Sequence, residues 1–371
     1  MQIQFYITGA AMRVNWTIGL VSILCMILSE TAAAQDSDAY REEKALGADL
    51  ARQGETQRES RNSQDRSVIS LVSENDLFGG SDRNYTNGLR IERFAPASKA
   101  RPWLRWAADV VPFVDVDQVQ IRSGLGLSHA IFTPKDIEAP IPDPNDRPYA
   151  GWLYVSSTAV ALANNRLDQH SLQLNLGVVG PSAGGAFVQT HWHELIDGKN
   201  PNGWDYQLHD ELGVEIIAER LRRIRKSRLG PFEIDSAVFG GVTLGNVHTH
   251  ASAGGMVRLG FDLDSDFGPP RIRPSIGGAG TFNPNDDFGG YLFWGAEGRY
   301  VVRNIFLDGN TFDENGPRVT ARRRWVGDIQ TGIAINIKST QIAFTYVHRT
   351  EQFQAQDGAD KFGAVSISVV Y

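Results

Sequence analysis

The 371-residue chain carries 36 Lys and Arg against 43 Asp and Glu, a formal net charge of −7, and 42% of its residues are apolar. This composition excludes a disordered chain and a helical membrane protein, and the acidic balance argues against a nucleic-acid partner. The single cysteine, Cys25, excludes an internal disulfide framework and a cluster of thiolate metal ligands.

The first 34 residues have the pattern of a secretory signal peptide. Arg13 precedes an apolar stretch at 18–28, and three alanines follow at 32–34. The stretch is shorter than the roughly 20 apolar residues that a membrane anchor needs, so we expect cleavage after Ala34. Residues 35–66 are polar and charge-mixed. We expect them to form a disordered tail or a solvated helix that carries no chemistry.

From residue 67 onward, apolar residues alternate with small or polar ones, most clearly at 171–178 and 364–371. This period of two predicts strands whose two faces meet different surroundings. In a membrane barrel the apolar face meets lipid and the interior is polar, whereas in a soluble sandwich the apolar face forms the core. An exported, glycine-rich chain that ends on an aromatic residue favours the barrel.

Twelve segments fit strands of such a barrel. They are 68–74, 87–94, 119–132, 151–163, 168–180, 211–221, 232–247, 249–263, 291–304, 323–337, 341–348 and 362–371. The expected fold class is therefore all-β, an outer-membrane antiparallel β-barrel of about twelve strands at 67–371, with polar outer loops and a few short helices. A periplasmic β-sandwich is the alternative. Two inner connections, 95–118 and 264–290, are longer than turns; they hold short helices, or the strand count is wrong there.

The richest polar motifs fall in the odd-numbered connections, which face the cell exterior if the first strand runs outward. Asn75 and Asp76 end the first strand, Thr86 opens the second, Arg147 precedes the fourth, and His193 lies in the long fifth connection. A base, a carboxylate, hydrogen-bond donors and a cation are the groups that a hydrolytic site needs. One rim of the barrel is thus predicted to hold such a site.

Each of these motifs also has a plainer interpretation. Asn75 and Asp76 fit an ordinary turn, Arg147 a solvated loop charge, and His193 a structural histidine. His191 and His193 lie on one side of an extended segment or on different faces of a helix. His248 and His250 alternate like metal ligands, but no third ligand is evident. No serine-nucleophile elbow motif appears, which favours attack by water over an acyl-enzyme.

Several motifs, taken in order, resemble those of the lipid A 3'-O-deacylase family of outer-membrane enzymes. The resemblance covers essentially 67–371. It rests on SEND at 73–76, YTNG at 85–88, FTP at 132–134, DRPYAG at 146–151, HELI at 193–196, GWDYQL at 203–208, GNV at 245–247, RLG at 258–260 and NIFLDG at 304–309.

This resemblance implies a twelve-stranded barrel whose site faces the outer leaflet and hydrolyses the ester of the 3'-linked acyloxyacyl group of lipid A, with calcium (Ca2+) as cofactor. His193 would be the base that activates water, with His191, two residues away, as the alternative. Asn75, Asp76 and Thr86 would form a polar cradle that orients the histidine, binds the cation or donates to the oxyanion.

The same resemblance implies that Arg147, with Tyr149 beside it, binds a phosphate or polar headgroup of the substrate. Asp76, Glu194 and Asp205 are the available oxygen ligands for calcium, and the choice among them stays open. Such an ion would stabilise the negative charge that develops on the ester carbonyl oxygen.

The expected location is the bacterial outer membrane, and the expected partner is lipid A of lipopolysaccharide in the outer leaflet. Tyr371 resembles the terminal signal read by outer-membrane assembly machinery, a second expected partner. We expect a monomer. The alternatives are an outer-membrane phospholipase with a serine nucleophile and a non-enzymatic, porin-like barrel.

Overall fold

The computed structural model describes residues 2–7, 10–15, 66–76, 84–99, 119–270, 272, 282–284 and 286–371. The chain divides into two units, Met1–Arg61 and Asn62–Tyr371. In the first unit, β1 (Gln2–Ile7) and β2 (Ala10–Asn15) pair as an antiparallel sheet. The apolar stretch and cleavage site of the predicted signal peptide, and the predicted tail up to residue 65, lie outside the described residues.

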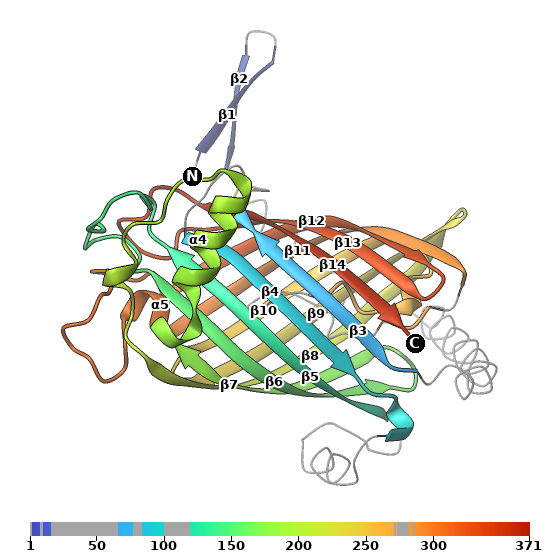
Figure 1. Cartoon of the computed structure of the whole chain (residues 1–371). Coiled ribbons are helices and arrows are strands. Elements are labelled where there is room, and N and C mark those ends of the chain that lie inside the picture. Colours follow the sequence, from blue (N-terminus) through green and yellow to red (C-terminus); the bar gives the residue numbers. More distant parts are fainter. Residues whose placement is uncertain are drawn as a thin grey trace. The chain divides into compact units, whose positions relative to one another are not determined.

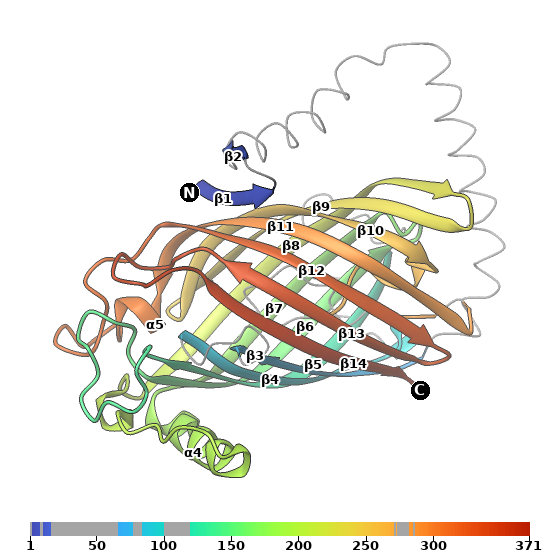
Figure 2. The same ribbon diagram turned by 90° about the horizontal axis from the view of Figure 1, so that it is seen from above.

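The second unit is a closed antiparallel barrel of twelve strands in the part of the chain that the structure describes (Figures 1 and 2). Each strand pairs with the next, and the last pairs with the first, from Gly363 opposite Asn75 to Val370 opposite Val68. The predicted fold class is confirmed and the sandwich alternative is wrong. The strands are β3 (Val68–Asn75), β4 (Asn84–Phe94), β5 (Val119–Thr133), β6 (Ala150–Ala163), β7 (Asp168–Val179), β8 (Glu211–Leu229), β9 (Phe232–Gly245), β10 (His248–Phe261), β11 (Phe288–Asn304), β12 (Trp325–Ile337), β13 (Thr340–Arg349) and β14 (Asp360–Val370).

Short helices occupy several connections. They are η2 (Ala97–Lys99), η4 (Pro181–Ala183), α4 (Gly185–Ile196), η5 (Trp204–Tyr206), η6 (Leu263–Ser265) and α5 (Ile305–Asp308). The two long inner connections contain short helices, as expected. The connection at 95–118 contains η2, and the β10–β11 connection begins with η6. Among the described residues, none of the helices has both the length and the apolar character needed to cross a membrane.

Strand alternation gives the barrel an apolar outside and a polar lumen. Leu71, Ile91, Leu127 and Val155 lie opposite one another on β3 to β6 and are 44–54% exposed. We call these four residues the lipid row, since exposed apolar side chains on a barrel wall meet the hydrocarbon of the bilayer. The side chains between them on each strand point into the lumen.

Hydrogen bonds between polar side chains connect β7, β8 and β10 on the lumenal side of the wall. Gln173 donates to Asn175 at 2.7 Å, and Asn175 donates to Glu215 at 2.9 Å. The other carboxylate oxygen of Glu215 lies 2.6 Å from Nδ1 of His248. His248 is therefore held by a lumenal carboxylate, which agrees with its interpretation as a structural histidine.

The connections define two ends of the barrel. Residues 164–167, 230–231 and 338–339 are short turns at the end that holds Val68 and Tyr371, whereas most connections at the other end are long. Outer-membrane barrels have short periplasmic turns and longer extracellular loops. We therefore call the end with the short turns the periplasmic end and the opposite end the outer end.

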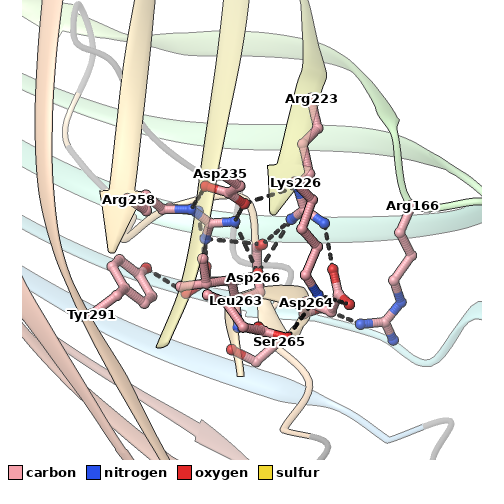
Figure 3. Close-up of polar contacts among 12 residues, drawn as sticks. Arg166, Arg223, Lys226, Asp235, Arg258, Leu263, Asp264, Ser265, Asp266 and Tyr291 are labelled. Atoms are coloured by element: carbon pink, nitrogen blue, oxygen red, sulfur yellow. Dashed lines mark hydrogen bonds and ion pairs between the residues drawn. The ribbon is translucent and has the colours of Figure 1, made fainter. Parts of the chain in front are cut away.

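A network of buried charges lies toward the periplasmic end of the lumen (Figure 3). The Arg258 guanidinium contacts Asp235 at 2.5 Å and Asp266 at 2.6 Å, and all three side chains are about 2% exposed. Arg223 contacts Asp264 at 2.5 Å and Asp235 at 3.1 Å. Burial raises the pKa of Asp264, but Arg223 and Lys226 outweigh this effect and bring that pKa below its ordinary value. The network ties the start of the β10–β11 connection to the inner wall.

Two described points of the same connection lie in the lumen. Ile272 donates its backbone N–H to Glu74 at 3.1 Å, near the outer end of β3, while Phe282 packs with Val68 and Phe94 near the periplasmic end. The connection therefore contacts the lumenal side of the wall toward both ends of the barrel. Sequence patterns did not predict this arrangement, because a connection shows no period that reveals which side of the wall it follows.

Replacing Arg258 with methionine tests the network. The substitution leaves Asp266 buried without its cation and Asp235 with Arg223 alone, so we expect the free energy of unfolding to fall by about 3–5 kcal/mol. Tryptophan fluorescence in a urea titration measures this change. Arg225→Met, at an exposed position on β8, is the matched control, and equal effects of the two substitutions would contradict the account.

Candidate active site

A row of residues on the outer face of the wall marks the candidate site. Asn75, Asn87, Ile131 and Gly151 lie opposite one another on β3 to β6. Each lies four residues closer to the outer end than its counterpart in the lipid row, and so on the same, outward face. We call these four residues the rim row. Unlike the lipid row, Asn75 and Ile131 are buried, so other parts of the chain cover the outside of the wall here.

A β-bulge adds Thr86 to this outward face. The register between β4 and β5 shifts between Tyr85, which lies opposite Phe132, and Asn87, which lies opposite Ile131. The extra residue, Thr86, is buried and its hydroxyl lies 2.6 Å from the hydroxyl of Thr133. Thr133 follows Ile131 by two residues and so shares its face. The bulge thus brings two hydroxyl groups together beside the rim row.

Helix α4 lies outside the barrel at its outer end (Figure 2) and contacts β5 and β6. A Cβ atom on Gly151 would lie 3.0 Å from Cβ of Ala183 and 3.1 Å from the backbone nitrogen of Gly185, so η4 and the first turn of α4 contact the wall at this glycine. His129, two residues below Ile131 on the outward face, lies 2.9 Å from the carbonyl oxygen of Ala183. The absence of side chains at Gly151 and Gly185 permits this close approach.

His193 lies on the buried side of α4. Gly185, Gln189 and His193 are the buried residues of this helix, at the spacing of a single helical face. Nδ1 of His193 lies 2.5 Å from the carbonyl oxygen of Lys199. Because a carbonyl oxygen only accepts, Nδ1 carries the proton, and in the neutral ring Nε2 is the nitrogen that accepts one.

His191 lies on the other side of the helix. It is exposed, its Nδ1 lies 2.8 Å from the carbonyl oxygen of Phe187, and its ring lies 4.1 Å from the Phe187 ring. The two histidines therefore have different surroundings, and His193 is the one on the face that holds Gln189. The sequence left this segment open between a strand, with both histidines on one side, and a helix, which separates them.

Tyr149 and Trp204 connect the wall to α4. Tyr149 precedes Gly151 by two residues, its hydroxyl donates to the carbonyl of Ile137 at 2.9 Å, and its ring lies 4.8 Å from the Trp204 ring. Trp204 in turn donates from its indole nitrogen to Gln189 of α4 at 2.9 Å. These aromatic contacts hold the helix face that carries His193 against the rim of the barrel.

Arg147 lies on the lumenal side of the same rim. Its guanidinium stands over the Phe132 ring at 5.4 Å, and Phe132 stacks on Phe306 within the aromatic cluster of the lumen. The side chain is 1% exposed, and within the described parts of the chain its Nε and Nη2 atoms have no hydrogen-bond partner. Burial lowers the pKa of Arg147 to about 10, although Asp360 and Asp146 act in the opposite direction. A buried cation with open donors is suited to an anionic group.

The three predicted calcium ligands have different surroundings. Asp76 is 2% exposed and directly follows Asn75 of the rim row, whereas Glu194 on α4 and Asp205 on η5 are exposed. No three His, Cys, Asp or Glu side chains are grouped to hold a metal ion in the part of the chain that the structure describes.

The structure therefore places most candidate residues at one end of the barrel but on two sides of its wall. Asn75, Thr86 and Tyr149 share the outward face, which α4 covers, whereas Arg147 lies over the lumen. Two contributing residues were not predicted as site residues, Thr133 and Gln189. The FTP motif contains Thr133, and Gln189 precedes His193 by four residues, which is the helical spacing that would have revealed it.

These features define the class of protein: an outer-membrane β-barrel with a polar site at its outer end. The sequence profile of the family described as outer membrane protein LpxR matches residues 20–371. The chain belongs to this family, as the motifs predicted. No curated protein sequence matched the chain.

One solved structure supports the fold, and a second is less similar. LpxR from Salmonella typhimurium is 18% identical, with a TM-score of 0.66, and the match covers 82% of this chain and 100% of that one. The β domain of the Bordetella autotransporter BrkA is 10% identical, with a TM-score of 0.36, over 82% of this chain and 99% of that one. The first match supports the twelve-stranded barrel, and together with the family it confirms the outer-membrane location.

Proposed function

We propose that the protein is a lipid A 3'-O-deacylase, which hydrolyses the ester of the 3'-linked acyloxyacyl group in the outer leaflet. One observation carries the proposal: polar side chains of the rim row and of the neighbouring bulge lie on the lipid side of the wall, beneath a helix whose buried face presents a histidine. An ester of a membrane lipid reaches such a position without leaving the bilayer. Membership of the LpxR family supports the same activity.

In this proposal His193 is the general base. The hydrogen bond from Nδ1 to the carbonyl oxygen of Lys199 orients the ring. Nε2 then takes the proton of a water molecule as the water attacks the ester carbonyl. The proton then passes from His193 to the departing 3'-oxygen. The products are the free acyloxyacyl acid and a 3'-hydroxyl group on lipid A.

Asn75 and Thr86 are the proposed hydrogen-bond donors to the oxyanion. Both are buried on the outward face, and strand register brings Asn75 next to Asn87, the neighbour of Thr86. Donors fixed by a rigid wall need no reorganisation as the carbonyl oxygen becomes negative. Thr133, whose hydroxyl contacts that of Thr86, would hold the threonine in position.

Calcium is part of the proposal. Asp76 would hold the ion, with Asn75 and Thr86 as neighbouring oxygen donors of the kind that calcium prefers. The exposure of Glu194 and Asp205 gives no support for either as a ligand. A bound calcium ion would supply Lewis-acid stabilisation of the ester oxygen.

The rival functions have less support. The lumen contains a chain segment, a charge network and an aromatic cluster, which argues against a porin-like barrel. A serine hydrolase would need a serine that donates to a histidine. Ser182, which is exposed on η4, donates to Asp210 at 2.6 Å. Ser73 lies on β3, two residues before Asn75. Ser81 lies outside the described residues.

Two further expectations remain proposals. Tyr371 would be read by the assembly machinery before its strand closes the barrel; its backbone then pairs with Ser67, and its hydroxyl accepts from Arg93 at 2.5 Å. The protein would act as a monomer, because a closed barrel has no open sheet edge to pair.

Replacing His193 with alanine is the first test. We expect deacylation of lipid A to fall about 10²–10⁴-fold, the usual contribution of a general base. Mass spectrometry of lipid A from expressing cells detects the loss of the acyloxyacyl group. His191→Ala is the matched control and should keep its activity. Loss of activity on replacing Ser73, Ser81 or Ser182, with His193→Ala still active, would contradict the mechanism.

Replacing Arg147 with methionine tests its role in substrate binding. Since a charge-assisted hydrogen bond contributes about 1.5–3 kcal/mol, kcat/KM for phosphorylated lipid A should fall about 10- to 100-fold. Steady-state kinetics of the purified protein with phosphorylated and dephosphorylated lipid A measure the difference. An equal loss with both substrates would show that Arg147 does not bind the phosphate.

Removing calcium tests the cofactor. A calcium-selective chelator should abolish deacylation by the purified protein, and added calcium should restore it, because the ion would stabilise the oxyanion. Asp76→Asn should raise the calcium concentration needed for half-maximal activity, whereas Glu194→Gln should leave it unchanged. Full activity in the chelator would contradict calcium dependence.

A further inference from the structure

Helix α4 has an inverted distribution of polar and apolar residues. Its buried side consists of Gly185, Gln189 and His193. Its large apolar side chains are all exposed, between 39% and 77%: Phe187, Val188, Trp192, Leu195 and Ile196. A surface helix in water buries its apolar side and exposes its polar side. Helix α4 buries its polar side and exposes its apolar side, which indicates that the medium outside α4 is apolar.

The position of α4 on the barrel indicates that this apolar medium is lipid. The helix contacts the outward face of the wall at Gly151, and the lipid row continues this face toward the periplasm, with Val155 four residues along the same strand. At a strand rise of about 3.3 Å per residue, the two levels are about 13 Å apart along the strand. The exposed side of α4 therefore borders the surface of the barrel that already meets lipid.

The direction and composition of α4 fit a helix that lies in the membrane plane. Figure 1 shows α4 crossing the barrel strands obliquely, outside their outer ends. Glu194 is its only Asp, Glu, Lys or Arg residue. Trp192 is the kind of side chain that favours the boundary between headgroups and hydrocarbon.

We propose that the exposed side of α4, formed by Phe187, Val188, Trp192 and Leu195, inserts among the acyl chains of the outer-leaflet bilayer. The bilayer then completes the packing of the helix from outside, and the wall packs against it from inside. Interfacial helices bind membranes in this way, through the apolar area that they bury. The bulk bilayer is the partner, so the inference holds whether or not the protein hydrolyses lipid A.

Single labels on α4 test this proposal. In the mature protein, which has no cysteine once the segment that contains Cys25 is cleaved, Val188, Trp192 and Leu195 are each replaced by cysteine and labelled with an environment-sensitive fluorophore. The folded protein is then reconstituted in phosphatidylcholine vesicles. We expect emission shifted to the blue and quenched by nitroxide lipids, but not by a water-soluble paramagnetic quencher.

Two exposed apolar positions provide matched controls. Leu125→Cys on β5, 70% exposed on the face of the lipid row, reports the bilayer, and Phe312→Cys, 91% exposed in the β11–β12 connection, reports water. Labels on α4 that behave like the Leu125 label support the proposal. It is overturned if they behave like the Phe312 label, or if energy transfer between labelled chains shows that a second copy covers the helix.

Discussion

Closure of the barrel is the constraint on which the other features depend. Because the twelve strands form one continuous sheet, each strand side chain faces either lipid or lumen, and cross-strand register fixes its height. Leu71, Ile91, Leu127 and Val155 occupy one such level, and Asn75, Asn87, Ile131 and Gly151 occupy another on the same face. Because the second row contains Asn75 and Asn87, the polar candidate site lies on the lipid-facing side of the wall.

Helix α4 shields the polar residues of the rim row from the hydrocarbon of the bilayer. Amide groups on the outward face would otherwise meet hydrocarbon, where polar groups without partners are costly. Gly151 and Gly185 allow the helix to approach the wall, and Trp204 joins it to the rim through Gln189. In the proposed function, the helix thereby creates a polar layer between the wall and the bilayer, in which water and an ester would meet.

The strands were predictable from the sequence because period-two alternation is a local signal. The pairing of Asn75 with Asn87, the bulge at Thr86 and the opposite placement of Arg147 and Tyr149 were not predictable, since they depend on register across the closed barrel. Helix α4 was ambiguous because its buried residues are Gly, Gln and His, the reverse of a soluble helix. The motifs indicated the candidate residues, but the arrangement of these residues on the two sides of the wall required the fold.

Photo-crosslinking in intact cells tests the central claim, that the ester of the substrate meets the outward face of the wall, while only a phosphate of the headgroup reaches Arg147 at the lumenal side of the rim. A photoreactive residue is placed at Asn87, in the rim row, or at His250, in the lumenal pocket. His193→Ala in both proteins keeps the substrate intact. We expect a lipopolysaccharide adduct from the Asn87 position alone. An adduct from His250, with none from Asn87, would contradict the account.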